Sequence, residues 1–146
     1  MLSGMLNSKL KIINSTMGSV RHCLKNNDLG FNGFGEIYFS TINKNSIKAW
    51  KLHKIMTMNL TVQYGSVFFC FKDNRQESDT YNNICKVILN DKNYVRLTVP
   101  PNIWFGFKGL SDSLVCNISD IRHSESEVIR KDLKAIHFNW DRINNI

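Results

Sequence analysis

The sequence predicts an all-β protein, and the preferred architecture is a double-sheet jelly roll. Strand-like segments follow one another at a spacing of about 8–12 residues, with no long helical pattern between them. The 146 residues, of which 42% are hydrophobic and 21% charged, suit a single domain, which we take to span residues 1–146. Two prolines and eight glycines are too few for a disordered or collagen-like chain.

The strand candidates are rich in aromatic and β-branched residues, and polar or turn-forming residues separate them. Asn43–Asn45 and Asn90–Asn93 are turn-like clusters, while Gly65 marks a hairpin. Asp73–Asn83 predicts a long polar loop, too hydrophilic to be buried, and Pro100–Asn102 predicts a corner. In chain order the candidates are Phe34–Ile42, Ser46–His53, Met58–Tyr64, Ser66–Lys72, Ile84–Leu89, Tyr94–Val99, Trp104–Phe107 and Ser113–Ile118.

The two ends of the chain carry the only plausible helices. Residues 1–17 form an N-terminal arm without the apolar block of a signal peptide. Ser124–Leu133 opens the C-terminal segment, residues 124–146, with alternating serines and glutamates, which favour a helix start. The tail after it carries Phe138 and Trp140, so we expect it to dock on the domain. No apolar run approaches the roughly 18 residues of a membrane span, so we expect no membrane partner.

The charge of the chain is basic but dispersed. Nineteen Lys and Arg against twelve Asp and Glu give a net charge of +7, and the pI is about 9.4. The basic residues run from Lys9 to Lys134 without a block of five or more, and they do not interleave with aromatics as in an RNA-binding signature. We therefore expect no nucleic-acid partner and favour a pocket for an anionic small molecule such as a nucleotide diphosphate.

The cysteines and histidines show no metal-binding spacing. The four cysteines form no CxxC pair, and most of them sit in apolar, strand-like runs where a free thiol packs as a small hydrophobe. A reducing cytoplasm is the simplest inference. Only His53 is placed on a central strand as a jelly-roll ligand would be, so we expect no metal. GxGxxG, P-loop, HExxH and GxSxG motifs are absent from the sequence.

One strand candidate, Ser46–Lys54, combines strand alternation with ionisable groups. In a regular strand Lys51 and His53 share a face with two small or apolar residues, while Lys48 points to the other face. Such a mixed face is typical of a lined cavity, and equally of a solvent-facing edge.

Two further segments are candidates for pocket walls. Pro100–Phe107 places three aromatics behind a rigid corner, either as core or as a wall for a sugar or base. Ser113–His123 ends with Asp120 and Arg122 just past a buried-looking strand, and residues at strand ends commonly carry function, although surface charge explains them as well.

Three segments together carry a family resemblance. They are Gly33–Ser40 (GFGEIYFS), Ile47–Lys54 (IKAWKLHK) and Arg96–Phe107 (RLTVPPNIWFGF). In their order and spacing, from Gly18 to Trp140, the chain resembles the dTDP-4-dehydrorhamnose 3,5-epimerase family of sugar-nucleotide cupins. The chain looks shorter than full-length family members.

The resemblance implies a cupin-type jelly roll, or double-stranded β-helix, with short terminal helices, and a homodimer without metal or other cofactor. It also implies a cytoplasmic role in making deoxysugars for surface polysaccharide. The family reaction removes a proton beside a 4-keto group and returns it on the other face. In this sequence Lys48 stands at the family's arginine, Lys51 at its catalytic histidine, and Phe105 at a second histidine. After Ser119 and Asp120 no tyrosine stands where the family has its acid.

The leading hypothesis is an isomerase acting on a dTDP-linked 4-keto-6-deoxy sugar. Lys51 would abstract the proton, with its pKa lowered by burial or nearby cations, and His53 would assist. The substrate-binding candidates are Lys48, Arg96, Trp104, Phe105 and Asp120.

Two alternatives remain open at this stage. The first is a cupin that binds a nucleotide sugar or a partner enzyme without transforming it, motivated by the missing histidine and tyrosine. The second is a nucleic-acid-binding β-domain, motivated by charge alone.

Overall fold

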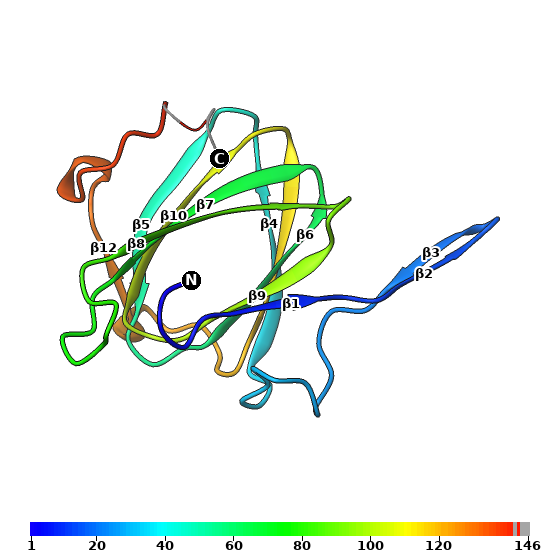
Figure 1. Cartoon of the computed structure of the whole chain (residues 1–146), viewed down its shortest axis with the longest axis horizontal. Coiled ribbons are helices and arrows are strands. Elements are labelled where there is room, and N and C mark those ends of the chain that lie inside the picture. The colour runs from blue at the N-terminus through cyan, green and yellow to red at the C-terminus, as the bar shows by residue number, and fades with distance from the viewer. Residues whose placement is uncertain (142, 144–146) are drawn as a thin grey trace.

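Two five-stranded sheets face each other in the computed structural model, which describes residues 1–141 and 143 (Figure 1). Every pairing between named strands is antiparallel. The first sheet has the order β1 (Leu6–Lys9), β9 (Val95–Val99), β6 (Met58–Tyr64), β11 (Ser113–Ser119) and β4 (Glu36–Ile42). The second has the order β12 (Val128–Arg130), β5 (Ile47–His53), β10 (Ile103–Gly109), β7 (Ser66–Asp73) and β8 (Ile84–Asn90). Strands that follow one another in the sequence thus pass repeatedly from one sheet to the other. This topology confirms the cupin jelly roll expected from the sequence.

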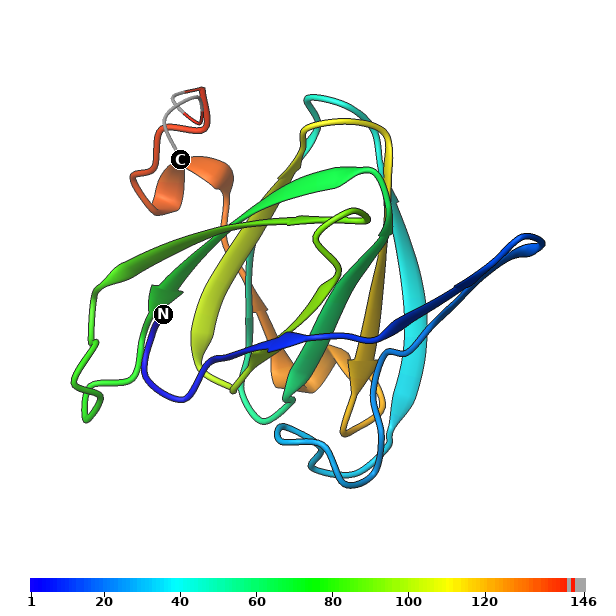
Figure 2. The same ribbon diagram turned by 45° about the vertical axis from the view of Figure 1, so that its right-hand side comes forward.

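The central strand predictions are confirmed within one or two residues at most boundaries, and β6 matches its predicted bounds at both ends. The N-terminal helix prediction is wrong. The arm instead adds β1 to the edge of the first sheet and then forms a hairpin of β2 (Ile12–Ser15) and β3 (Gly18–Arg21). This hairpin projects away from the two sheets (Figure 2).

The predicted helix over Ser124–Leu133 is also wrong. A single 3-10 turn, Glu125–Glu127, leads directly into β12, which pairs with β5. The edge of β5 offers unpaired backbone groups, and pairing with them outweighs the acidic helix-start pattern. A second 3-10 turn, Leu133–Ala135, follows. No helix in the described part of the chain is long and apolar enough to cross a membrane.

Apolar side chains form two clusters, one on each face of the second sheet. The main core lies between the sheets and includes Phe69, Phe71, Phe105 and Phe107. The other cluster covers the outer face, where the tail packs Ile136, Trp140 and Ile143 on residues of β5, β7 and β10. The expected docking of Phe138 and Trp140 is confirmed by their ring contacts with Trp50 and Phe68. Tail residues 142 and 144–146 lie outside the described residues.

The polar loop predicted over Asp73–Asn83 is confirmed for residues 74–83, none of which is buried, and only its first residue departs from the prediction. Asp73 is fully buried, although the loop that it begins was expected to be too hydrophilic for burial. Its carboxylate accepts hydrogen bonds from Arg75, Ser78 and Thr80 of the same loop, at 2.6–3.0 Å. Polar residues of the loop thus enclose a charge instead of lying free in solvent, because a buried charge must be paired.

A bulge in β5 decides which side chains reach the space between the sheets. Lys51 lies opposite Phe105, but the next pair joins Lys48 to Phe107, so three steps on β5 match two on β10. A side chain at Gly106 would place its Cβ 2.5 Å from the Cβ of Ala49, so glycine permits the close approach at the bulge. Regular alternation would separate Lys48 from Lys51; the bulge brings both to one side.

Candidate functional site

An interior cavity lies between the sheets at the end where β5 meets β12. It encloses about 100 Å³ and is closed mainly by apolar side chains of both sheets. The first sheet contributes Tyr38, Ser40, Met58, Leu60, Val115 and Asn117, and the second contributes Lys48, Lys51, His53, Phe69, Phe105 and Phe107. His123, Val128 and Arg130 complete the lining. An enclosed chamber in which apolar side chains and several convergent polar groups meet is typical of a small-molecule site.

An open groove of about 710 Å³ adjoins this inner cavity. Lys48, Lys51 and Arg130 line both spaces and form what we call the cationic rim. Lys131 adds a further positive charge to the groove, while Asp132 is its acidic residue. A cluster of cations where a groove meets a chamber suits an anionic ligand such as a diphosphate.

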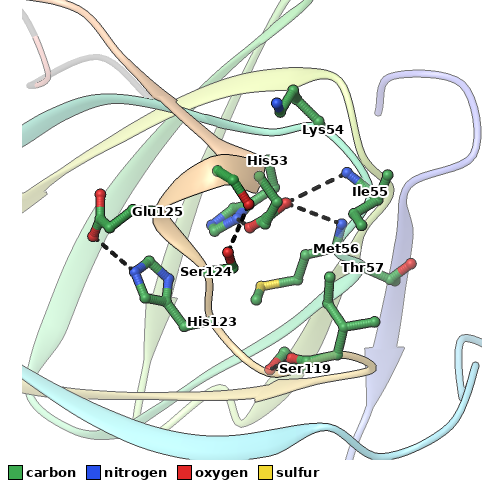
Figure 3. A network of polar contacts seen from close by, with 12 residues as sticks. His53, Lys54, Ile55, Met56, Thr57, Ser119, His123, Ser124 and Glu125 are labelled. Atoms are coloured by element: carbon green, nitrogen blue, oxygen red, sulfur yellow. Dashed lines mark hydrogen bonds and ion pairs between the residues drawn. The ribbon is translucent and has the colours of Figure 1, made fainter.

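Buried His53 and Glu127 form the polar centre of the inner cavity. They are 4% and 5% exposed, and Nδ1 of His53 is hydrogen-bonded to Oε1 of Glu127. The other carboxylate oxygen accepts from the backbone N–H groups of Ile55 and Met56, each at 3.4 Å (Figure 3). The imidazole also stacks on Phe105, with ring centroids 5.6 Å apart. His53 is therefore fixed in orientation on two sides.

The hydrogen-bond pattern defines the tautomer of His53. Burial lowers the pKa of His53, although the bond to Glu127 opposes this, so the neutral imidazole is favoured near pH 7. Burial alone would raise the pKa of Glu127, but the His53 and backbone hydrogen bonds outweigh it and lower the pKa. A carboxylate only accepts, so the proton of neutral His53 resides on Nδ1 and the lone pair on Nε2.

Nε2 of His53 has no hydrogen-bond partner among the described residues. Among those residues, the buried side-chain nitrogens or oxygens without a partner are Nε of Arg96 and Nε1 of Trp140. The unpartnered Nε2 is therefore not sealed from solvent, and His53 lines the inner cavity.

Lys51 stands at the rim. Its side chain is exposed at the mouth, and partial burial, followed by the charges of Arg130 and Lys48, lowers its pKa. Lys48 also reaches back across the mouth, where Nζ donates to the backbone oxygen of Thr41 at 2.7 Å. Glu125 accepts a hydrogen bond from His123 (Figure 3). It also accepts from Arg130, and the side chains of both donors line the inner cavity. The entrance to the inner cavity is thus cationic, and the carboxylate of Glu125 holds Arg130 and His123 beside it.

The structure brings together some of the predicted site residues. Lys51, His53, Lys48 and Phe105 all line the inner cavity. Lys48 was expected on the opposite face of the strand, and that expectation is wrong because of the bulge in β5.

The structure places three other predicted residues elsewhere. Arg96 points away from the space between the sheets, where it pairs with Asp28 at 2.8 Å and donates to the backbone of Cys23 and Leu29. It anchors the segment before β4 and cannot hold a ligand in the inner cavity.

Trp104 and Asp120 are also outside the lining. Trp104 belongs to the outer cluster, where Nε1 donates to Asn74 at 3.2 Å and Lys131 lies 4.6 Å from its ring. Asp120 accepts from the backbone N–H of Thr57 at 2.8 Å and so fixes the turn before β6. The position of Trp104 follows from alternation along β10, where its neighbour Phe105 faces the cavity, whereas Asp120 lies just beyond the end of β11.

Sequence reasoning missed Glu127, Tyr38, Asn117 and Arg130. A signal for Tyr38 was available, since Glu36, Tyr38 and Ser40 alternate with apolar residues along β4. Glu127 gave no comparable signal, because its role depends on β12 pairing with β5 far away in sequence.

Comparison with known proteins identifies the family to which this chain belongs. A sequence profile described as dTDP-4-dehydrorhamnose 3,5-epimerase matches residues 31–146. The chain belongs to this family. The resemblance drawn from the sequence is thereby confirmed, and with it the class of reaction, the isomerisation of a dTDP-linked sugar. A search of curated proteins found no match to the chain.

Three solved structures superimpose closely on the chain. The crystal structure of a dTDP sugar isomerase from Desulfovibrio desulfuricans G20 has 35% sequence identity and a TM-score of 0.91, covering 95% of this chain and 92% of that one. A dTDP-4-dehydrorhamnose 3,5-epimerase from Sulfolobus tokodaii has 21% identity and a TM-score of 0.84, covering 93% and 81%. A sugar 3,4-ketoisomerase from Thermoanaerobacterium thermosaccharolyticum, in complex with TDP, has 21% identity and a TM-score of 0.75, covering 90% of each chain. The last two establish likeness of fold.

Proposed function

We propose that this epimerase-family chain inverts a carbon beside the keto group of a dTDP-linked 4-keto-6-deoxy sugar, and that His53 is the base. The observation that carries the proposal is a neutral imidazole, oriented by Glu127, that lines an enclosed cavity with a cationic entrance and whose Nε2 has no partner among the described residues. The sugar ring occupies the inner cavity and the diphosphate lies against the cationic rim. The nucleoside extends into the open groove.

The assignment of the base to His53 revises the expectation that Lys51 abstracts the proton. Burial, followed by the charges of Arg130 and Lys48, lowers the pKa of Lys51, but its side chain is exposed at the mouth and no hydrogen bond from a described residue orients it. His53 is neutral near pH 7 and is held by Glu127, so it can accept a proton at once. In this proposal Lys51 stays cationic and stabilises the negative charge of the enolate or the diphosphate.

Hydrogen exchange tests the proposed reaction directly. The protein is incubated with dTDP-4-keto-6-deoxyglucose in deuterated water, and the sugar is followed by mass and proton NMR. Deuterium beside the keto group, above a no-enzyme control, is expected. His53→Gln should reduce that exchange about 100-fold or more, while the exposed histidine variant His137→Gln should not.

The outcomes separate the possible functions. Full exchange by His53→Gln would place the base elsewhere and contradict its assignment. Binding of the sugar nucleotide without exchange by the wild-type protein would favour the non-catalytic cupin. Absence of both binding and exchange would contradict the proposed substrate class.

We also propose that the protein acts as a homodimer in the cytoplasm, in deoxysugar synthesis for surface polysaccharide. Support for the dimer comes from exposed apolar side chains on the outer face of β4 and on the projecting hairpin: Ile37, Phe39, Ile13, Met17 and Val20. Light scattering of the purified chain should give twice the mass of 16.9 kDa, and Phe39→Glu should shift it to the monomer. A monomeric wild-type protein would contradict the dimer. The four free cysteines support the cytoplasmic location.

A further inference from the structure

The wall of the inner cavity opposite His53 carries its own polar pair. Tyr38 on β4 and Asn117 on β11 are direct partners in the first sheet, and both line the cavity. His53 lies on β5 of the second sheet. The two walls therefore each present a group that can transfer a proton, Tyr38 on one side and His53 on the other, to the same enclosed space.

The hydrogen bonds of Asn117 determine the role of the Tyr38 hydroxyl. The backbone N–H of Asn59 donates to Oδ1 of Asn117 at 3.1 Å, which identifies that amide atom as the oxygen. Nδ2 of Asn117 consequently faces the hydroxyl of Tyr38, 2.8 Å away, and donates to it. Because the Tyr38 oxygen accepts this bond, its own hydrogen is left to donate, and no described residue accepts it.

The surroundings of Tyr38 keep that hydrogen in place. Burial raises the pKa of Tyr38, the bond from Asn117 opposes the rise, and the charges of Glu36 and Glu127 add to it. Tyr38 is thus a protonated donor facing the cavity at neutral pH.

Inversion at a carbon requires a base on one face of the sugar and an acid on the other. We propose that Tyr38 is the general acid of the reaction, positioned by Asn117, and that it delivers a proton to the face opposite His53. The inference rests on the proposed function. It supplies the acid that the chain lacks after Asp120, where the family has a tyrosine.

The step balances without a further reactant. Nε2 of His53 takes the proton from the carbon beside the keto group, and the C–H electron pair forms the carbon–carbon double bond of an enolate. The carbonyl then reforms as the same carbon takes the hydrogen of the Tyr38 hydroxyl on its other face. The phenolate regains a proton from water, and the imidazolium loses one to water, so the net change is the inverted carbon.

The two half-reactions can be measured separately with Tyr38→Phe. Deuterium entering the recovered substrate reports proton abstraction and return by His53, whereas the inverted sugar reports delivery from the opposite face. We expect Tyr38→Phe to form inverted product about 100-fold more slowly while substrate exchange continues. The matched control is Tyr64→Phe, which removes the hydroxyl of an exposed tyrosine outside the cavity and should behave as wild type.

Several outcomes overturn the assignment. Product formation at the wild-type rate by Tyr38→Phe excludes Tyr38 as the acid. If Tyr38→Phe melts like the wild type but loses both substrate exchange and product formation, then the role of Tyr38 is not confined to delivering the proton on the face opposite His53. A wild-type protein that neither exchanges nor inverts overturns the proposed function and this inference with it, whereas an active wild type with an active Tyr38→Phe overturns this inference alone.

A gentler replacement covers the case in which Tyr38→Phe fails to fold. Introducing 3-fluorotyrosine at position 38 keeps the hydroxyl and lowers its pKa. The alkaline limb of the rate of inversion should move to lower pH, and the same replacement at position 64 should leave it in place. An unmoved limb at position 38 overturns the assignment.

Discussion

Asp73 and Glu127 are both buried carboxylates, but their surroundings differ in one decisive respect. Both carboxylate oxygens of Asp73 accept hydrogen bonds from residues of its own loop. Arg75, one of these donors, also donates to the backbone oxygen of Ser3 at 2.6 Å. Glu127 is held by two backbone N–H groups and by His53, whose second ring nitrogen has no partner among the described residues. The first network is closed on itself, and the second leaves a lone pair available to a cavity.

This difference separates a structural charge from one equipped for chemistry. A closed network satisfies every buried polar group and fixes the chain, here the loop after β7 and the N-terminal arm. An open network keeps one reactive atom unsatisfied, which stabilises nothing in the free protein and becomes useful when a substrate enters. Removing either carboxylate should therefore affect different properties of the protein.

The largest effect is expected from Glu127→Gln. Loss of the carboxylate charge releases the tautomer and the orientation of His53, so kcat should fall on the order of 100-fold with little change in KM. Glu127 raises the pKa of His53, so the acid limb of the rate should also move to lower pH. Steady-state kinetics across pH measure both effects, with Glu77→Gln in the exposed loop as control. Unchanged kcat and an unmoved acid limb would show that Glu127 does not act through His53.

Asp73→Asn tests the other side of the comparison. The amide keeps the shape but loses the charge that pairs with Arg75, so the free energy of unfolding should fall by about 2–3 kcal/mol. Urea unfolding measures this, and Asp79→Asn, an exposed change in the same loop, should lie close to wild type. Activity of the folded variant should be retained, because Asp73 does not line the cavity. A loss of activity without a loss of stability would reverse the two roles.

The same contrast explains what the sequence could predict. Period-two patterns and turn residues located the central strands, since those signals are local, and three motifs identified the family. The same local alternation put Lys48 on the wrong face, because the bulge beside Ala49 depends on the approach of Gly106 from β10. Arg96 and Trp104 show the converse limit: charge and aromatic character suggest a binding role, but only the assembled sheets show which face each one takes.

The site itself needed contacts between distant segments. Glu127 reaches His53 only because β12 pairs with β5, and the Ser124–Leu133 segment gave a local helix signal that this pairing overrides. Tyr38 gains its donor role from Asn117, which in turn takes its amide orientation from the backbone of Asn59. Such chains of hydrogen bonds leave no pattern along the sequence.

A smaller effect is expected from Lys51→Met, which tests the role of the cationic rim independently of the buried His53–Glu127 pair. Loss of one rim cation should raise KM for the sugar nucleotide about tenfold, because Lys48 and Arg130 remain at the entrance. Substrate exchange in deuterated water should continue at saturating substrate. Complete loss of exchange with intact binding would return the role of base to Lys51. Lys134→Met, an exposed change that leaves the rim untouched, is the matched control.

The smallest effect concerns the pH dependence of stability. Burial, assisted by the charges of Lys51 and His123, lowers the pKa of His53 below its unfolded value of about 6.5 despite the opposing bond from Glu127. Below about pH 6.5, His53 binds a proton in the unfolded chain but not yet in the folded chain. The free energy of unfolding should therefore fall as the pH drops from about 6.5. Asp73 and Glu127 also have lowered pKa values in the fold, and they reduce the free energy of unfolding only at lower pH, near and below their unfolded pKa values of about 3.9 and 4.3.

Urea unfolding at a series of mildly acidic pH values can therefore isolate the histidine. His53→Gln should flatten the dependence above the carboxylate range, whereas His137→Gln should retain it, because the side chain of His137 is exposed and takes no part in the hydrogen bond between His53 and Glu127. An equally steep dependence in His53→Gln would assign the acid sensitivity to another group. It would also remove the expectation that His53 enters the catalytic cycle neutral, on which its assignment as the base depends.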